Sequence, residues 1–407
     1  MERNYPLTGL KVVELATVIA APVTARMLSD YGAEVIKIEN YPNGDLLRPT
    51  GKGHSLPTED DHNPLFDMFN AGKKLISLDL KQPEAMEIFH KLLSEADIFI
   101  TNLRIGSLEH MGLDYEALKD KYPRLIFGHF SGFGIEGEEV NRPGFDTTAF
   151  WMRSGASVDI STPGTFPIRP SFGSGDIATA SGFLAALLMA VLGRKKTGKG
   201  SLVSTCLQKA GIWCNATGIV NAQPQYGKKY PVDRYQPWDP FSDYYRCKDG
   251  EYIAFMEKVY ARDKYLFAEI FHMPELTEDP RLASLDTMRE SGQLPEVTKK
   301  VQEIMLTKTS EEWKAIFDAH DVANEIARHF CDVYQDKQAQ ANHAFDEVMY
   351  PGGIKTSLPT PPFYFSAYER KPFQKTGAIG RDTDIVLEAM GYSAETVQQM
   401  REKNILK

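Results

Sequence analysis

The chain has 407 residues, a formal net charge of −9, 42% hydrophobic residues and 25% charged residues. This composition is typical of soluble globular proteins and excludes wholesale disorder, a collagen-like repeat and a small disulfide scaffold. The length exceeds what one hydrophobic core usually holds, so we expect two or more domains. The acidic balance argues against a nucleic-acid-binding protein, whose affinity depends on neutralising phosphates.

The first third of the chain alternates between strand-like and helix-like segments. Apolar, β-branched runs predict strands at Leu10–Leu15, Glu34–Glu39, Leu75–Leu80, Asp97–Asn102 and Leu125–Phe130. Apolar residues three and four apart predict helices at Pro22–Tyr31, from Pro83 onward and around Tyr115–Lys121. This alternation predicts an α/β fold with a doubly wound, mostly parallel sheet and helices on both faces.

The rest of the chain predicts a buried helix and a second, smaller unit. The apolar run Ile177–Leu192 is shorter than the roughly 20 residues that span a bilayer, so we expect a buried helix and no membrane anchor. After Gly200 the sequence predicts a strand that enters a long helix, and Asn221–Pro240 is predicted to be a linker or an active-site loop. A hairpin is expected at Tyr244–Met256, turning at Asp249-Gly250. Helices are expected from Ala261 to Ile316, and a last helix is expected after Ser393.

The cysteines and the first residues predict a reduced, cytoplasmic setting. The four cysteines lack the short spacing of a zinc site or a redox motif, and they are Cys206, Cys214, Cys247 and Cys331. The sequence MERNYPLTGLKVVEL has no signal-peptide core.

Two glycine-rich motifs and the histidines were tested as cofactor or metal sites. The segment Gly193–Gly200 approaches a phosphate loop, but Gly200 replaces the Mg²⁺-binding hydroxyl and the segment follows a helix. The segment Gly173–Ala178 fits a dinucleotide fingerprint, but prolines precede it and no acidic residue follows before Asp233, so we expect no NAD. The nine histidines show no metal-ligand spacing, so we expect no metal.

Asp176 is the strongest candidate for chemistry that the residues alone provide. It lies on a Gly-Ser-Gly turn directly before the apolar helix. One interpretation is a helix N-cap, worth about 1 kcal/mol. The other is a nucleophile on an acyl group, with glycines that let a thioester approach and a helix N-terminus that favours developing negative charge.

The sequence resembles class III CoA-transferases, a family that includes formyl-CoA transferase, carnitine CoA-transferase and α-methylacyl-CoA racemase. The matching pieces run in order along nearly the whole chain: LTGLKVVEL, YGAEVIKIEN, NGDLLR, NAGKKLISLDLK, EADIFITNLRIGSLEHMGLDYEAL, PRLIFGHFSGFG, RPGFDTTAF, GSGDIATASGFLAALLMAVLGRKKTGKG and GRDTDIVLEAMGYS. Within the family, RPGFDTTAFWMRSG is most similar to enzymes of amino-acid fermentation that move CoA onto 2-hydroxy acids such as phenyllactate and 2-hydroxyisocaproate.

The resemblance implies a role for individual residues. Asp176 matches the catalytic aspartate. Positions that match or neighbour the CoA site are Ile19, Ala20, Asn40, Leu78, Lys81, Asn102, Leu103, Arg104, His110 and Arg142. Arg104, Arg48, Lys81 and Arg142 are candidates for the CoA phosphates. Formyl-CoA transferase has an arginine in place of Asn40, so adenine contacts differ there.

The resemblance also implies a fold and a reaction. Asp176 attacks the thioester of an acyl-CoA donor such as an enoyl-CoA, and the CoA passes to a small carboxylic acid through covalent aspartyl intermediates. Backbone N–H groups near Gly173–Ile177 are expected to stabilise the oxyanion. Family members form interlocked, ring-like homodimers. The implied domains are a Rossmann-like CoA-binding part at 1–220, a linker and small domain at 221–330, and a return to the large domain at 331–407. Asn221–Pro240 and Tyr350–Pro362 are the expected long connections.

Two alternatives stay open, an acyl-CoA racemase or isomerase on the same fold and a non-catalytic CoA-binding protein. The racemase branch carries a proton-shuttling histidine where this chain has Phe145, which argues against racemisation. The glycine-rich loop of formyl-CoA transferase has no clear counterpart. Gln236–Pro240 occupies the comparable region, where Trp238 and Phe241 are candidates for an apolar pocket.

Overall fold

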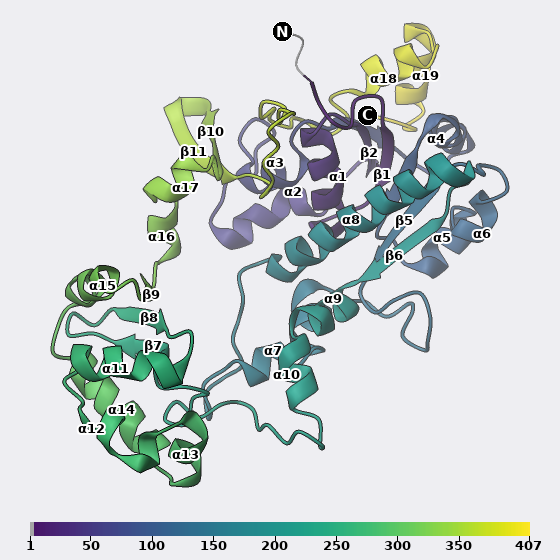
Figure 1. Cartoon of the computed structure of the whole chain (residues 1–407). Coiled ribbons are helices and arrows are strands. Elements are labelled where there is room, and N and C mark those ends of the chain that lie inside the picture. Colours follow the sequence, from purple (N-terminus) through teal and green to yellow (C-terminus); the bar gives the residue numbers. More distant parts are fainter. Residues whose placement is uncertain (1–3) are drawn as a thin grey trace. The chain divides into compact units, whose positions relative to one another are not determined.

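The computed structural model describes residues 4–407, and the chain divides into two compact units. The first unit combines the residues up to Ser157 with Arg169–Gln223 and Lys337–Lys407, and the second combines Val158–Ile168 with Pro224–Asp336. Figure 1 labels the elements of both units. No sequence signal indicated that the short segment Val158–Ile168 belongs to the second unit.

A six-stranded parallel sheet forms the centre of the first unit (Figure 1). Its strands are β1 (Lys11–Leu15), β2 (Glu34–Asn40), β3 (Lys74–Leu78), β4 (Ile98–Thr101), β5 (Ile126–Ser131) and β6 (Leu202–Cys206). They lie in the order β3-β2-β1-β4-β5-β6, so the winding reverses between β1 and β4. In sheets of this order, ligands bind in the crevice at the carboxyl ends of the strands where the reversal occurs. The predicted α/β fold with a parallel sheet is confirmed.

Helices cover both faces of this sheet, because successive strand residues point to opposite sides. Val12 lies in one core and Val13 in the other. The first core takes its helices from α1 (Ala20–Asp30), α3 (Pro64–Asn70), α8 (Ser174–Thr197) and α9 (Leu207–Cys214). The second takes them from α4 (Pro83–Glu95), α5 (Ile105–Met111), α6 (Tyr115–Leu118), α18 (Thr383–Ala389) and α19 (Ala394–Glu402). The C-terminal tail therefore returns to the first unit, where α18 contacts β3.

Helix α8 is longer and less buried than its sequence predicted. By length and composition alone, this helix of 24 residues could cross a membrane, and 39% of its most apolar stretch of 18 residues is buried. It nevertheless contacts α1, α9, β5 and β6, as a covering helix of the sheet does. Its first turn brings Asp176 to the edge of the sheet.

Shorter elements complete the first unit. They are α2 (Leu47–Thr50), the 3₁₀ helix η1 (Gly51–His54), the π-helix η2 (Asp146–Met152), α10 (Ala216–Asn221), α17 (Lys337–Ala341), the hairpin strands β10 (Phe345–Tyr350) and β11 (Ile354–Pro359), and the 3₁₀ helix η4 (Pro351–Gly353) between them. Helix α7 (Ala156–Asp159) begins in the first unit and ends in the second. The long helix expected after Gly200 is wrong, because it ends at Cys214 and resumes at Ala216. Tyr350–Pro362 is no extended connection, since most of it pairs in this hairpin.

The second unit is a small sheet covered by helices. Its strands β7 (Ser242–Arg246), β8 (Tyr252–Met256) and β9 (Ala323–Ile326) pair antiparallel, which confirms the hairpin that turns at Asp249-Gly250. Its helices are α11 (Tyr260–Ile270), α12 (Glu275–Glu278), η3 (Pro280–Leu282), α13 (Leu285–Glu290), α14 (Leu294–Met305), α15 (Ser310–Ala319) and α16 (Phe330–Val333). Phe241 lies fully buried in its core, with its ring centroid 5.0 Å from that of Phe267. Phe241 therefore fills a core and shapes no pocket, contrary to the sequence prediction.

Candidate active site

Asp176 lies at the third position of α8, where the helix begins beside the carboxyl edge of the sheet. Gly173 precedes the helix in a left-handed conformation (φ 77°), and no side chain caps the N-terminus. Asp176 is therefore not the N-cap that one interpretation of the sequence proposed. Its side chain is 7% exposed and lines a hollow of about 320 Å³. The buried carboxyl thus opens into a cavity instead of into the core.

The space beside the glycines around Asp176 is filled by other side chains of the protein. A Cβ on Gly173 would lie 2.5 Å from Cδ1 of Ile19, in the turn after β1. A Cβ on Gly175 would lie 2.3 Å from Oδ1 of Asp146 and 2.5 Å from the ring of Phe150. The Gly-Ser-Gly sequence predicted that this space admits an approaching thioester. In the structure it lets the β1–α1 turn and η2 pack against the first turn of α8.

A second carboxylate, Asp146, adds to the effect of burial on the charge of Asp176. Burial, followed by repulsion from Asp146, raises the pKa of Asp176 from 3.8 to about 7. Burial also raises the pKa of Asp146, although the backbone amides of Gly175 and Asp176 oppose that rise. Oδ1 of Asp146 forms no hydrogen bond of normal geometry, so the two amides act on it as nearby dipoles.

The expected oxyanion site at Gly173–Ile177 is not available in this arrangement. The N–H of Ile177 donates to the carbonyl of Gly173, and that of Ser174 donates to the carbonyl of Ser171. The amides of Gly175 and Asp176 face the Asp146 carboxylate. The first turn of α8 therefore has its donors directed within the protein.

A larger hollow of about 880 Å³ adjoins the one that contains Asp176, and the two share Thr17, Leu103 and Ser107. The residues singled out from sequence divide between them. Those lining the smaller hollow are Ile19, Ala20, Asn102, Leu103, Arg104, Arg142 and Asp176. Those lining the larger hollow are Asn40, Leu78, Lys81, Leu103 and His110. The structure thus brings all of them to one continuous crevice.

This crevice lies where the sheet reverses its winding. Thr17 follows β1 and Asn102 follows β4, and these two strands are neighbours with opposite crossover directions. Asn102 accepts a hydrogen bond from the Thr17 N–H (3.0 Å) and donates one to its carbonyl (2.8 Å). The crevice is therefore the ligand-binding position that this sheet topology predicts.

Comparisons with known proteins identify the family of the chain. The model of CoA-transferase family III matches residues 7–383. The chain belongs to CoA-transferase family III. It is 38% identical to the (R)-2-hydroxy-4-methylpentanoate CoA-transferase of Clostridioides difficile, over 98% of this chain and 99% of that protein. It is 35% identical to the cinnamoyl-CoA:phenyllactate CoA-transferase of Clostridium sporogenes, over 100% of this chain and 99% of that protein.

A solved structure shares the fold of this chain. A CAIB/BAIF family protein from Brucella suis superposes with a TM-score of 0.77 and 25% identity, over 95% of this chain and 100% of that one. The resemblance drawn from sequence motifs is confirmed. A family III CoA-transferase acts on CoA thioesters, so its site must accommodate the phosphates and the acyl group of such a molecule.

The cations of this CoA-transferase differ in their freedom to meet phosphates. Arg104 and Lys81 are exposed at the crevice and form no ion pair within residues 4–407. Arg142 pairs with Glu139 and lies 5.1 Å from the ring centroid of Phe133. Arg104 and Lys81 are thus the better-placed phosphate contacts.

Arg48, also a phosphate candidate from sequence, is wrong for that role. It is 7% exposed, and its Nε lies 2.7 Å and its Nη2 2.8 Å from the two carboxylate oxygens of Glu39. A guanidinium held by two parallel bonds to a buried carboxylate has no donors directed at the crevice. Its role is to fix the segment between β2 and α3.

The hollow beside Asp176 has an apolar rim that sequence reasoning missed. Leu46 is 68% exposed and Phe145 is 64% exposed, and both line this hollow. Exposed large apolar side chains that line a cavity are typical of binding sites for apolar ligands. The sequence signal that pointed to them was weak, because Leu46 follows Asp45 in a loop and Phe145 precedes η2.

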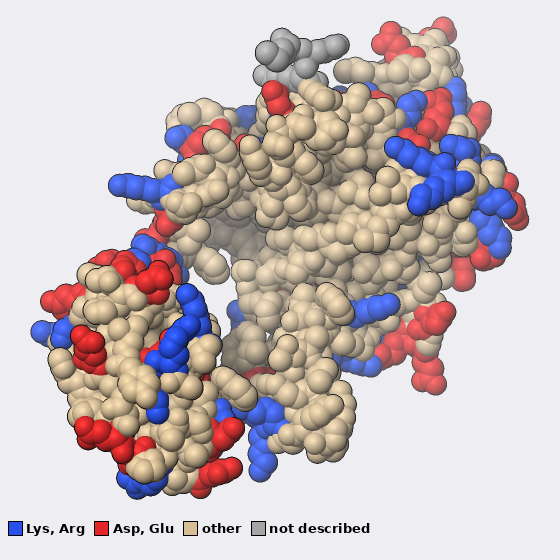
Figure 2. Space-filling view, viewed as in Figure 1, with Lys and Arg blue, Asp and Glu red and all other residues tan. Residues whose placement is uncertain are grey.

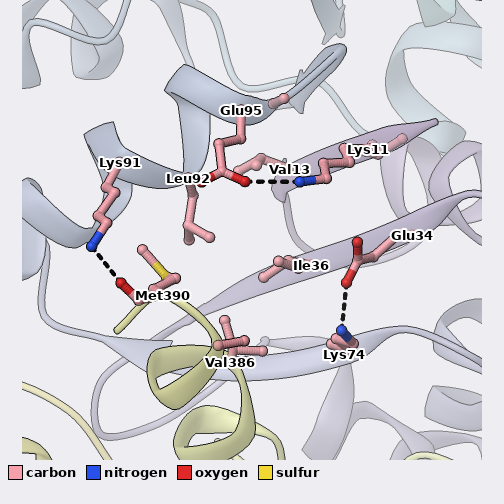
Figure 3. Close-up of a pocket in the computed structure, with 13 residues that line it drawn as sticks. Lys11, Val13, Glu34, Ile36, Lys74, Lys91, Leu92, Glu95, Val386 and Met390 are labelled. Atoms are coloured by element: carbon pink, nitrogen blue, oxygen red, sulfur yellow. Dashed lines mark hydrogen bonds and ion pairs between the residues drawn. The ribbon is translucent and has the colours of Figure 1, made fainter. Parts of the chain in front are cut away.

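Figure 3 shows a third hollow, of about 210 Å³, at the opposite edge of the same sheet, where the amino ends of β1, β2 and β3 meet. Two of its three lysines are ion-paired, since Lys11 Nζ lies 2.8 Å from Glu95 and Lys74 pairs with Glu34, and Lys91 donates to the carbonyl of Met390. It therefore offers phosphates little, and the crevice at the carboxyl edge remains the candidate site. Within residues 4–407, no group of three or more His, Cys, Asp or Glu side chains is arranged to hold a metal.

Proposed function

We propose that this CoA-transferase moves CoA from an acyl-CoA, such as an enoyl-CoA, to a free 2-hydroxy acid through covalent intermediates on Asp176. The observation that carries the proposal is a single carboxyl, 7% exposed, which opens into the hollow at the sheet's winding reversal. A carboxylate in a confined cavity is a nucleophile on a thioester from which water can be excluded. The names of the two relatives, both CoA-transferases for 2-hydroxy acids, support the acceptor class.

The reaction proceeds in four balanced steps. An oxygen of the Asp176 carboxylate attacks the thioester carbonyl, the C–S bond breaks, and a mixed anhydride and CoA thiolate result. The thiolate attacks the aspartyl carbonyl, which releases the donor acid and leaves an aspartyl-CoA thioester. The acceptor carboxylate attacks that thioester to give a new anhydride, and the thiolate then attacks the acceptor carbonyl. This last step releases the new thioester and regenerates the Asp176 carboxylate.

The crevice suits the two ends of the CoA thioester. The larger hollow carries Lys81 and His110, and the smaller one carries Arg104 beside Asp176. We assign the nucleotide phosphates to Lys81 and Arg104 and the thioester to the smaller hollow. The exposed side chains of Leu46 and Phe145 at the rim favour an acceptor with an apolar side chain.

We also propose a homodimer of the interlocked kind that the family resemblance implied. Met189 and Leu192 on the outer face of α8 are 70% and 60% exposed, and Trp213 in α9 is 81% exposed. In Figure 2 the surface over α8 is largely uncharged up to its basic last turn. Large exposed apolar side chains gathered on neighbouring helices favour burial against another chain. A native mass near 45.7 kDa, the mass of one chain, would contradict the dimer. A reduced, cytoplasmic setting stays a prediction.

The decisive variant is Asp176→Ala, compared with Glu84→Ala, which removes an acidic residue from the first turn of α4. We expect Asp176→Ala to lose transfer by several orders of magnitude while it still binds CoA, and Glu84→Ala to keep full activity. Incubation with acyl-CoA and hydroxylamine should convert Asp176 to a hydroxamate, detected by peptide mass spectrometry. Full transfer by Asp176→Ala, or a hydroxamate on another residue, would end the proposal. Exchange of the substrate α-proton in D₂O would instead indicate a racemase.

A further inference from the structure

Four charged side chains form a buried network beneath the turn that connects β1 to α1. Lys37 Nζ lies 2.8 Å from Glu14 Oε1 and 2.8 Å from Asp45 Oδ2. Lys73 Nζ lies 2.7 Å from Glu14 Oε2. All four side chains are at most 1% exposed. Burying charges is unfavourable unless each finds a partner, so a network of this size calls for a structural or functional reason.

The network holds the backbone of the turn directly. Asp45 Oδ1 accepts the N–H of Val18 at 2.9 Å. Lys37 Nζ donates to the carbonyl of Ala16 at 2.7 Å. Together with the two bonds between Asn102 and Thr17, these contacts fix each of the three residues that follow β1.

The turn needs this support because Val18 adopts a left-handed conformation, with φ at 67°. A β-branched residue rarely occupies that region, since its Cβ substituents crowd the backbone. Such a conformation persists only where the surroundings over-determine it, and it is common at ligand sites. In this conformation the N–H of Val18 donates to Asp45, so Asp45 helps to hold it.

The same turn is the wall that the two hollows share. Thr17 lines both of them, and Val18 and Ile19 line the one that contains Asp176. Cδ1 of Ile19 also occupies the space above Gly173, the residue from which α8 begins. A displacement of the turn would therefore change both the shape of the CoA crevice and the position of Asp176.

We propose that Asp45 and Lys37 are positioning residues for CoA transfer, which hold the β1–α1 turn in its strained conformation and so shape the crevice for the thioester. Neither side chain lines the crevice, so both act through the turn. The inference rests on the crevice being the CoA site of the proposed function, but not on Asp176 being the nucleophile.

The test compares CoA binding, measured by calorimetry with free CoA, in Asp45→Ala and in Asp45→Ala/Val18→Gly. Asp45→Ala removes the acceptor of the Val18 N–H and should weaken CoA binding at least tenfold, with a matching rise in KM for acyl-CoA. Glycine adopts positive φ without strain, so adding Val18→Gly should recover threefold or more of that loss. A purely structural role predicts no recovery, because the second change removes a further side chain.

Two controls separate the turn from general stability. Asp45→Asn keeps an oxygen acceptor for Val18 but loses the charge that pairs with Lys37, so it should be less stable yet retain more CoA affinity than Asp45→Ala. Glu34→Ala removes an ion pair at the opposite end of β2, the pair with Lys74 in Figure 3, and should leave CoA affinity unchanged. An Asp45→Ala protein that binds CoA normally, or a double variant without recovery, would overturn the proposal.

A measurement on the unaltered protein covers the case in which Asp45→Ala does not fold. Binding of CoA should slow hydrogen exchange of the Val18 amide at least tenfold, because the turn that Asp45 holds is a wall of the site. Unchanged exchange at Val18 in the presence of saturating CoA would sink the inference. Hydroxamate formation at Asp176 would be unaffected by that result, so the two proposals fail separately.

Discussion

The charge coupling between the two carboxylates predicts a change in the pH dependence of transfer when Asp146 is replaced by asparagine. In the proposed mechanism Asp176 attacks as a carboxylate, so kcat/KM should rise as the pH rises through its pKa of about 7 in the free enzyme. Repulsion from Asp146 is the smaller of the two causes of that raised pKa, after burial. Asp146→Asn removes this repulsion and leaves the burial, so the pKa of Asp176 should fall.

The size of the shift follows from the same numbers. The pKa of Asp176 rises about three units, from 3.8 to about 7, and the smaller cause accounts for less than half of that. Asp146→Asn should therefore lower the pKa of Asp176 by about one unit, which is about 1.4 kcal/mol in the free energy of ionisation. At pH 5.5 the ionised fraction of Asp176 would rise by about eightfold.

The assay is the pH profile of kcat/KM for acyl-CoA between pH 5 and 9, in the unaltered protein and in Asp146→Asn. The matched control is Asp114→Asn, which replaces the carboxylate that caps α6 with an amide that caps equally well. The acidic limb should move to lower pH in Asp146→Asn alone. An unmoved limb, or one displaced to higher pH, would refute the idea that Asp146 keeps Asp176 protonated.

Three further predictions concern stability and binding. The pKa of Asp176 is raised in the folded state, so its contribution to stability is present below pH 3.8 and is lost as the pH rises through about 7. Asp176→Asn should therefore stabilise the protein by up to about 4 kcal/mol at pH 8.5 and hardly at all at pH 4, as measured by urea unfolding; an equal effect at both pH values would contradict this. Gly175→Ala should destabilise the fold by about 1–3 kcal/mol because its Cβ would overlap a carboxylate oxygen and an aromatic ring. Gly182→Ala in the same helix, where a Cβ meets nothing within 4 Å, should instead stabilise it by about 0.5–1 kcal/mol, and similar denaturation curves for both would count against the packing described. Arg104→Ala should raise KM for acyl-CoA about tenfold at unchanged stability. Arg48→Ala should lower the free energy of unfolding by about 3 kcal/mol, because it leaves a buried carboxylate unpaired. A raised KM in Arg48→Ala at unchanged stability, or a destabilised Arg104→Ala with unchanged KM, would refute these two assignments.

Much of the first unit follows from local sequence, because parallel strands buried on both faces are apolar and β-branched. Segments such as Leu10–Leu15 and Leu125–Phe130 therefore match β1 and β5 closely. The candidate site residues also gather as expected, since they come from the ends of strands that meet at one sheet edge. The strand order itself depends on long-range pairing, for which a single sequence gives no direct signal.

The incorrect predictions share one physical cause. The side chain that contacts a residue in the fold can lie far away along the sequence. The sequence predicted room for a substrate at Gly175, but that space belongs to Asp146 and Phe150. It also predicted a phosphate contact at Arg48, but Arg48 is bonded to Glu39. The charged network at Glu14 and Lys37 also escaped notice.

One signal could have found that network. A charged residue inside a strand that is buried on both faces must be paired, so Lys37 within the apolar run of β2 predicts a buried carboxylate close by. The sequence does not say which one, since Glu14 lies on β1 and Asp45 in the loop after β2. Only the fold brings them to the β1–α1 turn.

The most direct test of the covalent route through Asp176 uses an acceptor acid labelled with ¹⁸O in both carboxyl oxygens. In the proposed sequence, the acceptor oxygen that attacks the aspartyl thioester stays on Asp176 when the final thiolate attack breaks the anhydride. Peptide mass spectrometry after turnover should therefore find ¹⁸O in the Asp176 carboxyl and one ¹⁸O retained in the acyl-CoA product. Product that forms while Asp176 stays unlabelled would contradict the mechanism.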